Sequence, residues 1–184
     1  MHINREKLIE AYNEVQTRLS EYSLPTWEAL PDIELYMDQV ISLLRKYLAI
    51  FYGEAGSEKH ITSSMINNYV KLGLVPPPVK KKYARTHLAY LLIICTLKQT
   101  LDMATIQKII PLYLETEEVM KTYASFVNNQ HKAYLYVSDA LRVVADPILE
   151  EDNQERLNDL LMQVAASANI CKIVTERITK LPEE

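Results

Sequence analysis

Apolar residues recur at intervals of three and four along most of the chain, and this spacing places them on one face of a helix. The predicted helices cover residues 3–22, 33–52, 62–72, 85–100 and 102–113, then one or two between 114 and 146 and a last one from about 152 to 181, with a loop at 53–57. Asp146-Pro147 breaks the pattern before the last helix, which begins with Asp152 and Glu155 in capping-box spacing. We therefore expect an all-α fold.

Two segments between the predicted helices carry prolines. Residues 23–31 contain two prolines and the only tryptophan, so we expect an ordered connector in which Trp27 is a packing anchor. Pro76-Pro77-Pro78 excludes a helix and the interior of a sheet, which predicts a stiff, extended excursion over residues 73–83. The apolar run from Leu88 to Leu97 is about half as long as a membrane span, so it predicts a buried helix.

The short helix predicted at residues 62–72 has one polar face. Thr62 offers a hydroxyl cap at its start, and Gly73 ends it. The polar positions are occupied by Ser63, Ser64, Asn67, Asn68 and Lys71, and the inward positions by Met65, Ile66, Tyr69 and Leu72. Asn pairs bidentately with adenine and Ser contacts phosphate, so this face suits the major groove of DNA. Helix capping by the serines and core packing by Tyr69 are the structural alternatives.

Charge is distributed unevenly along the chain. Residues 1–58 hold 5 basic and 10 acidic side chains and residues 102–184 hold 8 and 14, whereas residues 59–101 hold 7 basic side chains and none that is acidic. The net charge of −4 therefore conceals a basic segment. A lysine-rich surface without carboxylates is typical of polyanion binding, because each lysine that meets a phosphate releases counterions. An ordinary solvated face is the alternative.

The segment from Ile61 to Pro77 resembles the recognition helix and wing of the MerR family of transcription regulators. The matching residues are Thr62 or Ser63 as the hydroxyl cap, then Ile66, Tyr69, Lys71, Gly73-Leu74 and Pro76. Downstream, Tyr83 and Arg85 stand like the aromatic–basic pair that closes the wing, and residues 88–97 and 102–110 stand like the two helices that follow it. The resemblance covers about residues 38–111 and implies a winged helix-turn-helix domain.

The chain departs from the MerR pattern at two positions of the recognition helix. Asn67 stands where the family usually has Arg, and Asn68 where it usually has an aromatic residue, so base readout differs. The wing is very short, with only Val79 and three lysines between Pro78 and Tyr83. Those lysines are expected to meet backbone phosphate or the minor groove. The expected DNA-binding residues are Thr62, Ser63, Ser64, Asn67, Asn68, Tyr69, Lys71, Lys80, Lys81, Lys82, Tyr83 and Arg85.

A second resemblance rests on Leu30 to Val40 together with this motif. It is to an uncharacterised bacterial family, a domain of unknown function, which implies no activity.

The last predicted helix carries a heptad seam. Steps of four and three join Leu157, Leu161, Val164, Ala168, Cys171, Thr175 and Ile178. The seam suits pairing with a second copy. The resemblance to MerR proteins, which dimerise through C-terminal helices, also implies a homodimer; packing within one small bundle is the alternative.

Tyrosines in the C-terminal part indicate either core packing or a pocket for a small-molecule effector. They are Tyr113, Tyr123, Tyr134 and Tyr136.

Enzymatic and metal-binding functions are not expected. The histidines His2, His60, His87 and His131 are scattered, and none pairs at helical spacing with Glu or Cys to hold a metal. No serine or cysteine has the signature of a nucleophile, and no cofactor motif is present. Cys95 and Cys171 are expected to be core thiols in a reducing compartment.

We therefore predict a MerR-like winged helix-turn-helix domain with additional N- and C-terminal helices that form a small bundle. The expected divisions are 1–37 for an N-terminal helix and connector, 38–111 for DNA binding, and 112–184 for dimerisation or an effector. The expected function is a sequence-specific DNA-binding transcription regulator with a recognition helix at 62–72 and a lysine-rich wing at 76–83; the alternative is a non-catalytic helical adaptor for an acidic protein. The first ten residues lack the apolar core of a signal peptide, so we expect a cytoplasmic protein without a membrane span.

Overall fold

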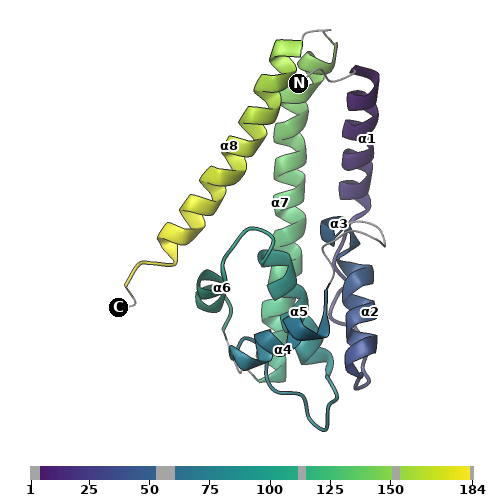
Figure 1. Cartoon of the computed structure of the whole chain (residues 1–184), viewed down its shortest axis with the longest axis vertical. Helices are drawn as coiled ribbons and strands as arrows, with labels where there is room; N and C mark the ends of the chain where they lie inside the picture. Colours follow the sequence, from purple (N-terminus) through teal and green to yellow (C-terminus); the bar gives the residue numbers. More distant parts are fainter. Residues whose placement is uncertain (1–4, 53–60, 112–114, 151–153, 183–184) are drawn as a thin grey trace. The chain divides into compact units, whose positions relative to one another are not determined.

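The computed structural model describes residues 5–52, 61–111, 115–150 and 154–182, and over these residues the chain is helical, with no strand. The all-α prediction is confirmed (Figure 1). The helices are α1 Arg5–Glu21, α2 Met37–Tyr47, α3 Ala49–Tyr52, α4 Ser63–Lys71, α5 Arg85–Leu97, α6 Met103–Ile109, α7 Thr116–Glu150 and α8 Gln154–Ile178. The predicted loop at 53–57 lies outside the described residues.

The chain divides into two compact units. The motif unit is Ser23–Asn129, and the helix-bundle unit combines Met1–Tyr22 with Gln130–Glu184. This division differs from the three consecutive segments expected at 1–37, 38–111 and 112–184. The connector belongs with the motif unit because Trp27 packs against Tyr123 of α7, with ring centroids 6.4 Å apart, and because the Tyr123 hydroxyl donates to the Pro25 carbonyl at 2.8 Å.

The core of the motif unit is built around α5. Every residue from His87 to Thr96 is buried, and a helix that is apolar all round is stable only when other elements surround it. Helix α2 packs against both α4 and α5 and contributes Val40 and Leu44, which are fully buried. The buried helix predicted from the run Leu88 to Leu97 is confirmed, although it ends at Leu97 and not at residue 100.

The helix expected at residues 33–52 is shorter and divided. Leu35 is extended and pairs with Tyr83 through two backbone hydrogen bonds, of 2.9 and 2.8 Å, so helix α2 begins only at Met37. Its start is stabilised by Gln39, whose side chain accepts the backbone N–H of Tyr36 at 2.9 Å. Helix α2 ends before Leu48, and the short α3 follows.

The expected break at Asp146-Pro147 does not occur. Helix α7 is one continuous helix that passes Pro147 and ends at Glu150. Proline has no N–H, so one backbone hydrogen bond of that turn is missing, and the rest of the helix continues through it. The proposed capping role of Asp152 lies outside the described residues.

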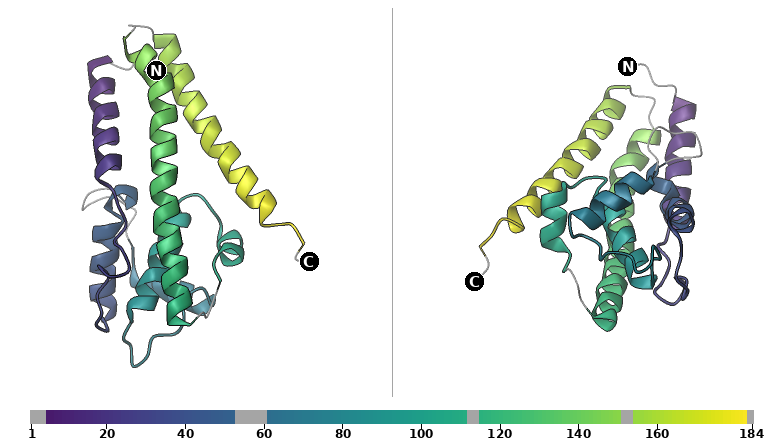
Figure 2. Two further views of the ribbon diagram at one scale, coloured as in Figure 1. Left: turned by 180° about the vertical axis from the view of Figure 1, so that it is seen from behind. Right: turned by 60° about the horizontal axis from the view of Figure 1, so that its bottom comes forward.

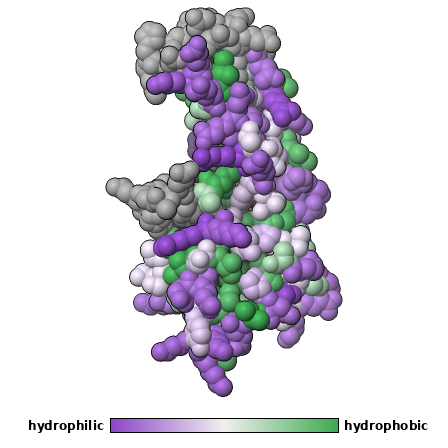
Figure 3. All heavy atoms as spheres, turned by 90° about the vertical axis from the view of Figure 1, so that its right-hand side faces the viewer, coloured by the Kyte–Doolittle hydropathy of each residue, from purple (hydrophilic) through white to green (hydrophobic). Residues whose placement is uncertain are grey.

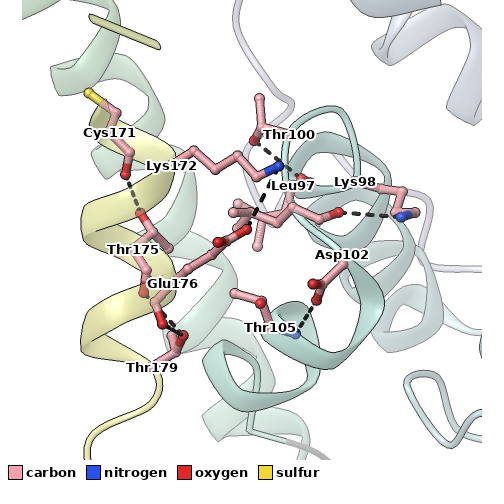
Figure 4. Close-up of polar contacts among 11 residues, drawn as sticks. Leu97, Lys98, Thr100, Asp102, Thr105, Cys171, Lys172, Thr175, Glu176 and Thr179 are labelled. Carbon is pink, nitrogen blue, oxygen red and sulfur yellow. Dashed lines mark hydrogen bonds and ion pairs between the residues drawn. The ribbon is translucent and has the colours of Figure 1, made fainter. Parts of the chain in front are cut away.

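The helix-bundle unit consists of α1, the second part of α7, and α8. Gln16 of α1 accepts a hydrogen bond of 2.8 Å from the hydroxyl of Ser138 in α7, and Ser138 is buried. Along α8, Thr175 and Thr179 donate to carbonyls one turn earlier, at 3.0 and 3.1 Å (Figure 4). These hydroxyls are therefore satisfied within their own helix.

On the face drawn in Figure 3, hydrophobic side chains lie among hydrophilic ones. No helix within the described ranges is long and apolar enough to span a membrane.

Cys95 is buried as predicted, but Cys171 is exposed, so the prediction of a second core thiol was wrong. It failed because the apolar pattern around Cys171 belongs to α8, whose side chains beyond Leu160 are not buried.

Candidate nucleic-acid interface

Helix α4 presents its polar residues on one exposed face. The exposed residues are Ser63, Ser64, Asn67, Asn68 and Lys71. They form two adjacent rows with a spacing of four, one at positions 63, 67 and 71 and the other at 64 and 68, along the same side of the helix. Ile66 and Tyr69 are buried on the opposite side. The side chains that hydrogen-bond most readily to DNA bases and phosphates are therefore in solvent, while Ile66 and Tyr69 hold the helix. Leu72, which was expected to face inward, is 44% exposed, because the helix ends at Lys71 just before it.

Both ends of α4 are fixed by local hydrogen bonds. At the start, the Thr62 hydroxyl accepts the N–H of Met65 at 3.3 Å, so Thr62 is the N-cap, as its sequence position predicts. At the end, Gly73 has a φ of 72°, and the N–H groups of Gly73 and Leu74 bond to the carbonyls of Val70 and Tyr69 at 3.0 and 2.9 Å. This is a Schellman motif, which requires the left-handed conformation that glycine adopts without steric cost.

The lysine-rich segment after α4 forms a tight hairpin. Val79 and Lys82 exchange two backbone hydrogen bonds, of 3.1 and 2.9 Å, and Lys80 and Lys81 occupy the turn with φ values of 50° and 64°. Two positive φ values in a two-residue loop define a type I′ turn, which normally carries Asn-Gly. The hairpin is visible as the loop at the lower edge of the left view in Figure 2. The side chains of Lys80 and Lys81 are exposed.

The base of the hairpin is anchored at two points. Tyr83 pairs with Leu35 through the two backbone hydrogen bonds described above, and its side chain is buried. His87, in the first turn of α5, accepts the N–H of Ala84 on Nδ1 at 3.0 Å. The ring proton is then on Nε2, which faces the carbonyl of Pro77 at 3.5 Å. His87 thus connects the chain entering the hairpin with the helix that leaves it.

The two basic residues at the base of the hairpin are engaged within the protein. Lys82 lies 3.7 Å from a carboxylate oxygen of Glu34, and Arg85 lies 3.3 Å from one of Asp32. Arg85 also donates to the carbonyl of Pro31 at 3.5 Å. The segment 59–101 contains no acidic residue, but the connector before α2, which extends from residue 23 to residue 36 in the structure, brings Asp32 and Glu34 to it.

Among the expected DNA-binding residues, the structure separates an exposed set from a packed set. The exposed set is Thr62, Ser63, Ser64, Asn67, Asn68, Lys71, Lys80 and Lys81. Tyr69 and Tyr83 are 4% and 3% exposed, so their side chains pack in the core and we leave them out of the interface. Lys82 and Arg85 are partly buried and paired. Within the described residues, no ion pair involves Lys71, Lys80 or Lys81.

Sequence reasoning missed the residues that hold Lys82 and Arg85. The rings of Tyr36 and Trp27 lie beneath these cations, 5.7 Å from Lys82 Nζ and 5.5 Å from the Arg85 guanidinium carbon. Arg45 was missed as well, and its guanidinium donates to the carbonyl of Ile61 at 3.0 Å, just before α4. No local pattern marks these residues, because their partners lie far away in the sequence.

The other candidate groups do not assemble into a site. No cluster of His, Cys, Asp or Glu that would hold a metal occurs in the described part of the chain. Of the tyrosines considered for an effector pocket, Tyr123 is fully buried, Tyr136 is 77% exposed and Tyr134 is intermediate in exposure. Tyr113, His2 and His60 lie outside the described residues.

Comparison with protein families identifies the domain. Residues 25–137 match the model described as Domain of unknown function (DUF1836). The chain belongs to this family. The DUF1836 match begins in the connector and includes α2 to α6 and the first part of α7, which is nearly the whole motif unit. The predicted resemblance to an uncharacterised family is thereby confirmed. Neither a curated protein nor a solved structure shows significant similarity to the chain.

We predict that the stability of the DUF1836 domain depends on pH through His87. Burial lowers the pKa of His87 below its usual 6.5. The carbonyl of Pro77, the backbone of Ala84 and the carboxylate of Glu34 raise this pKa, but by less than burial lowers it. As pH falls below about 6.5, the unfolded chain binds a proton that folded His87 resists, so the free energy of unfolding decreases. We predict a smaller loss between pH 7.5 and 5.5 in His87→Gln, which keeps a side-chain acceptor for Ala84. Urea unfolding at both pH values measures the free energy of unfolding of each variant.

The control is His131→Gln, which makes the same substitution at an exposed histidine. If His87→Gln loses as much stability as the parent between the two pH values, His87 is not responsible for the dependence.

Proposed function

We propose that this DUF1836 protein is a cytoplasmic, sequence-specific DNA-binding transcription regulator with a MerR-like winged helix-turn-helix. Helix α4, with its flanking residues 62–72, is the recognition helix, and residues 76–83 are the wing. The supporting observation is that one compact unit combines an exposed polar helix face with a hairpin whose tip carries two exposed lysines. An acidic protein partner is the competing ligand, and the experiments below distinguish the two.

The exposed face of α4 carries the chemistry needed to read a major groove. Asn67 and Asn68 each present a carboxamide, which accepts and donates at once and so matches the N7 and N6 groups of adenine. Ser63 and Ser64 lie in the first turn, where hydroxyls and backbone N–H groups meet phosphate. Lys71 adds one charge in the last turn. In this proposal the base contacts come from asparagine and not from arginine.

The hairpin contributes phosphate contacts. Lys80 and Lys81 hold left-handed backbone conformations that cost free energy for residues with a Cβ atom. Asn-Gly would suit the same turn better, but it would carry no charge. The presence of two lysines at positions that favour asparagine and glycine supports a role for their charge, and phosphate is the abundant anion on the ligand we propose. Such contacts position a protein without reading sequence.

We also propose that the protein acts as a homodimer through α8. The seam residues Leu161, Val164 and Ile178 are 46%, 40% and 61% exposed, which disfavours the alternative in which this seam packs within one chain. Burial of such a face stabilises association by about 25 cal/mol per Å². Two-fold symmetric proteins bind two half-sites about one helical turn apart, so a dimer also suits the proposed recognition of DNA.

The first prediction from this proposed function concerns the hairpin tip. The variant Lys80→Asn with Lys81→Gly should keep the turn, because Asn-Gly is the preferred pair for type I′. Binding to preferred and random duplexes should weaken alike, and the logarithmic dependence of affinity on salt should become shallower by about two units. Fluorescence anisotropy titrations at several salt concentrations measure both quantities. The preferred duplex is the one selected by the protein from a random-sequence pool.

A matched control removes two lysines from another surface. Lys121→Gln with Lys132→Gln changes the net charge equally, on the exposed side of α7, and should change DNA affinity less. If the tip variant binds with the affinity and salt dependence of the parent, the hairpin is not a DNA surface. The adaptor for an acidic protein then becomes the better proposal.

The second prediction separates base readout from phosphate contact. Asn67→Ala or Asn68→Ala should weaken binding to the preferred duplex by about 1 to 3 kcal/mol and binding to random duplex much less, because only base-edge hydrogen bonds discriminate between sequences. The salt dependence should stay the same. Equal losses on both duplexes for both variants would show that α4 does not read bases.

The third prediction concerns the dimer. The parent should sediment as a dimer at about tens of micromolar, where an interface of standard size is occupied. Leu161→Glu places a charge on the seam and should give a monomer with the same helix content. Met162→Glu is the control, because Met162 is exposed but lies beside the seam. A monomeric parent, or equal dissociation in both variants, would exclude this interface.

A further inference from the structure

Two carboxylates of the connector neutralise the base of the wing. Glu34 pairs with Lys82 and Asp32 with Arg85, at 3.7 and 3.3 Å between nitrogen and oxygen. Both distances exceed the roughly 2.7–2.9 Å of strong charge-assisted hydrogen bonds. The carboxylate of each pair is more than half exposed to solvent, which screens the attraction and weakens the pair. The carboxylates are therefore weakly held and exchange readily for another anion.

The carboxylates lie on the solvent side of each pair. The Asp32 side chain is 88% exposed and that of Arg85 only 21%, and Glu34 is 54% exposed against 38% for Lys82. An anion that approaches from solvent thus meets the acidic residue first. It reaches the cation by taking the position that the carboxylate oxygen occupies.

The cations keep a second partner when the carboxylates leave. Lys82 Nζ lies over the ring of Tyr36 and the Arg85 guanidinium over the ring of Trp27, and cation–π contact holds a charge without neutralising it. Trp27 is buried, so its ring is fixed in place. Lys82 and Arg85 therefore remain positioned to bind a phosphate oxygen after the acidic side chains have turned away.

We propose that Asp32 and Glu34 are resident counter-ions of the wing, which DNA phosphates displace on binding. This inference rests on the proposed function and adds a second stage to it. The exposed tip, Lys80 and Lys81, meets phosphate directly, whereas Lys82 and Arg85 do so only in exchange for their carboxylates. Breaking the two ion pairs costs free energy, and only a duplex whose phosphates contact Lys82 and Arg85 closely recovers it. Other duplexes bind more weakly. Asp32 and Glu34 thereby limit non-specific binding.

The test replaces one counter-ion with its neutral isostere. Glu34→Gln should raise the affinity for random duplex about two- to fivefold, as expected for the loss of a competing exposed ion pair. It should also make the salt dependence steeper by up to about one unit, because no freed carboxylate recruits a cation from solution. Anisotropy titrations over a range of salt concentrations, on preferred and random duplexes, measure both effects.

The matched control is Glu28→Gln. Glu28 lies in the same connector and is exposed, so its replacement removes the same charge from the same region. A double-mutant cycle adds Lys82→Ala: without Lys82, Glu34→Gln should raise affinity much less, because the pair no longer exists. General repulsion between carboxylates and DNA would instead give equal gains in every background.

The possible results separate this inference from the proposed function. If the parent binds DNA but Glu34→Gln and Glu28→Gln raise affinity equally, or if the gain persists in Lys82→Ala, the counter-ion role is overturned while DNA binding stands. If the parent binds no duplex at near-physiological salt, the proposed function fails and this inference fails with it. A larger gain for Glu34→Gln that disappears in the Lys82→Ala background supports both.

Discussion

The antiparallel pairing of Leu35 with Tyr83 is the contact on which the arrangement of the motif unit depends. Its two backbone hydrogen bonds join the connector before α2 to the end of the hairpin before α5, and both side chains are buried beside them. Backbone pairing shielded from water is costly to break. It places Glu34 and Tyr36 on one side of the hairpin base, where Lys82 meets both.

The hairpin is built to be stiff at its base and charged at its tip. Three prolines restrict the entering chain, His87 connects Pro77 to the start of α5, and the turn closes through paired backbone bonds. Unfavourable φ values at Lys80 and Lys81 persist because the surrounding structure determines them. Rigidity of this kind reduces the entropy lost when the tip meets a ligand.

The helix-bundle unit differs in how it buries its apolar residues. In the motif unit α5 is surrounded on all sides, whereas α8 leaves Ile170, Val174 and Ile178 at least half exposed. A helix of this length has little stability alone in water, and most helical stability comes from tertiary packing. Burial of these apolar residues against a second copy would stabilise α8, which is why we base the proposed homodimer on this helix.

The local sequence determined most of the helices and the exposed site residues. Helical periodicity, the Thr62 cap and Gly73 predicted α4 and its polar face, because these signals act within a few residues of one another. The start of α2 and the continuity of α7 past Pro147 were not predictable in this way. At Leu35 a distant backbone partner replaced the helix, and in α7 the surrounding helical turns outweighed one missing hydrogen bond.

Tertiary structure alone decided which basic residues remain available to a ligand. Lys80, Lys81, Lys82 and Arg85 look alike in the sequence, yet two are exposed and two are paired with acidic residues of the connector. Arg85 and its backbone partner Pro31 are 54 positions apart, far beyond the range of any local pattern. Segment charge is a property of composition, but the partner of each charge depends on distance in the folded chain, because Coulomb attraction falls with separation and with solvent screening.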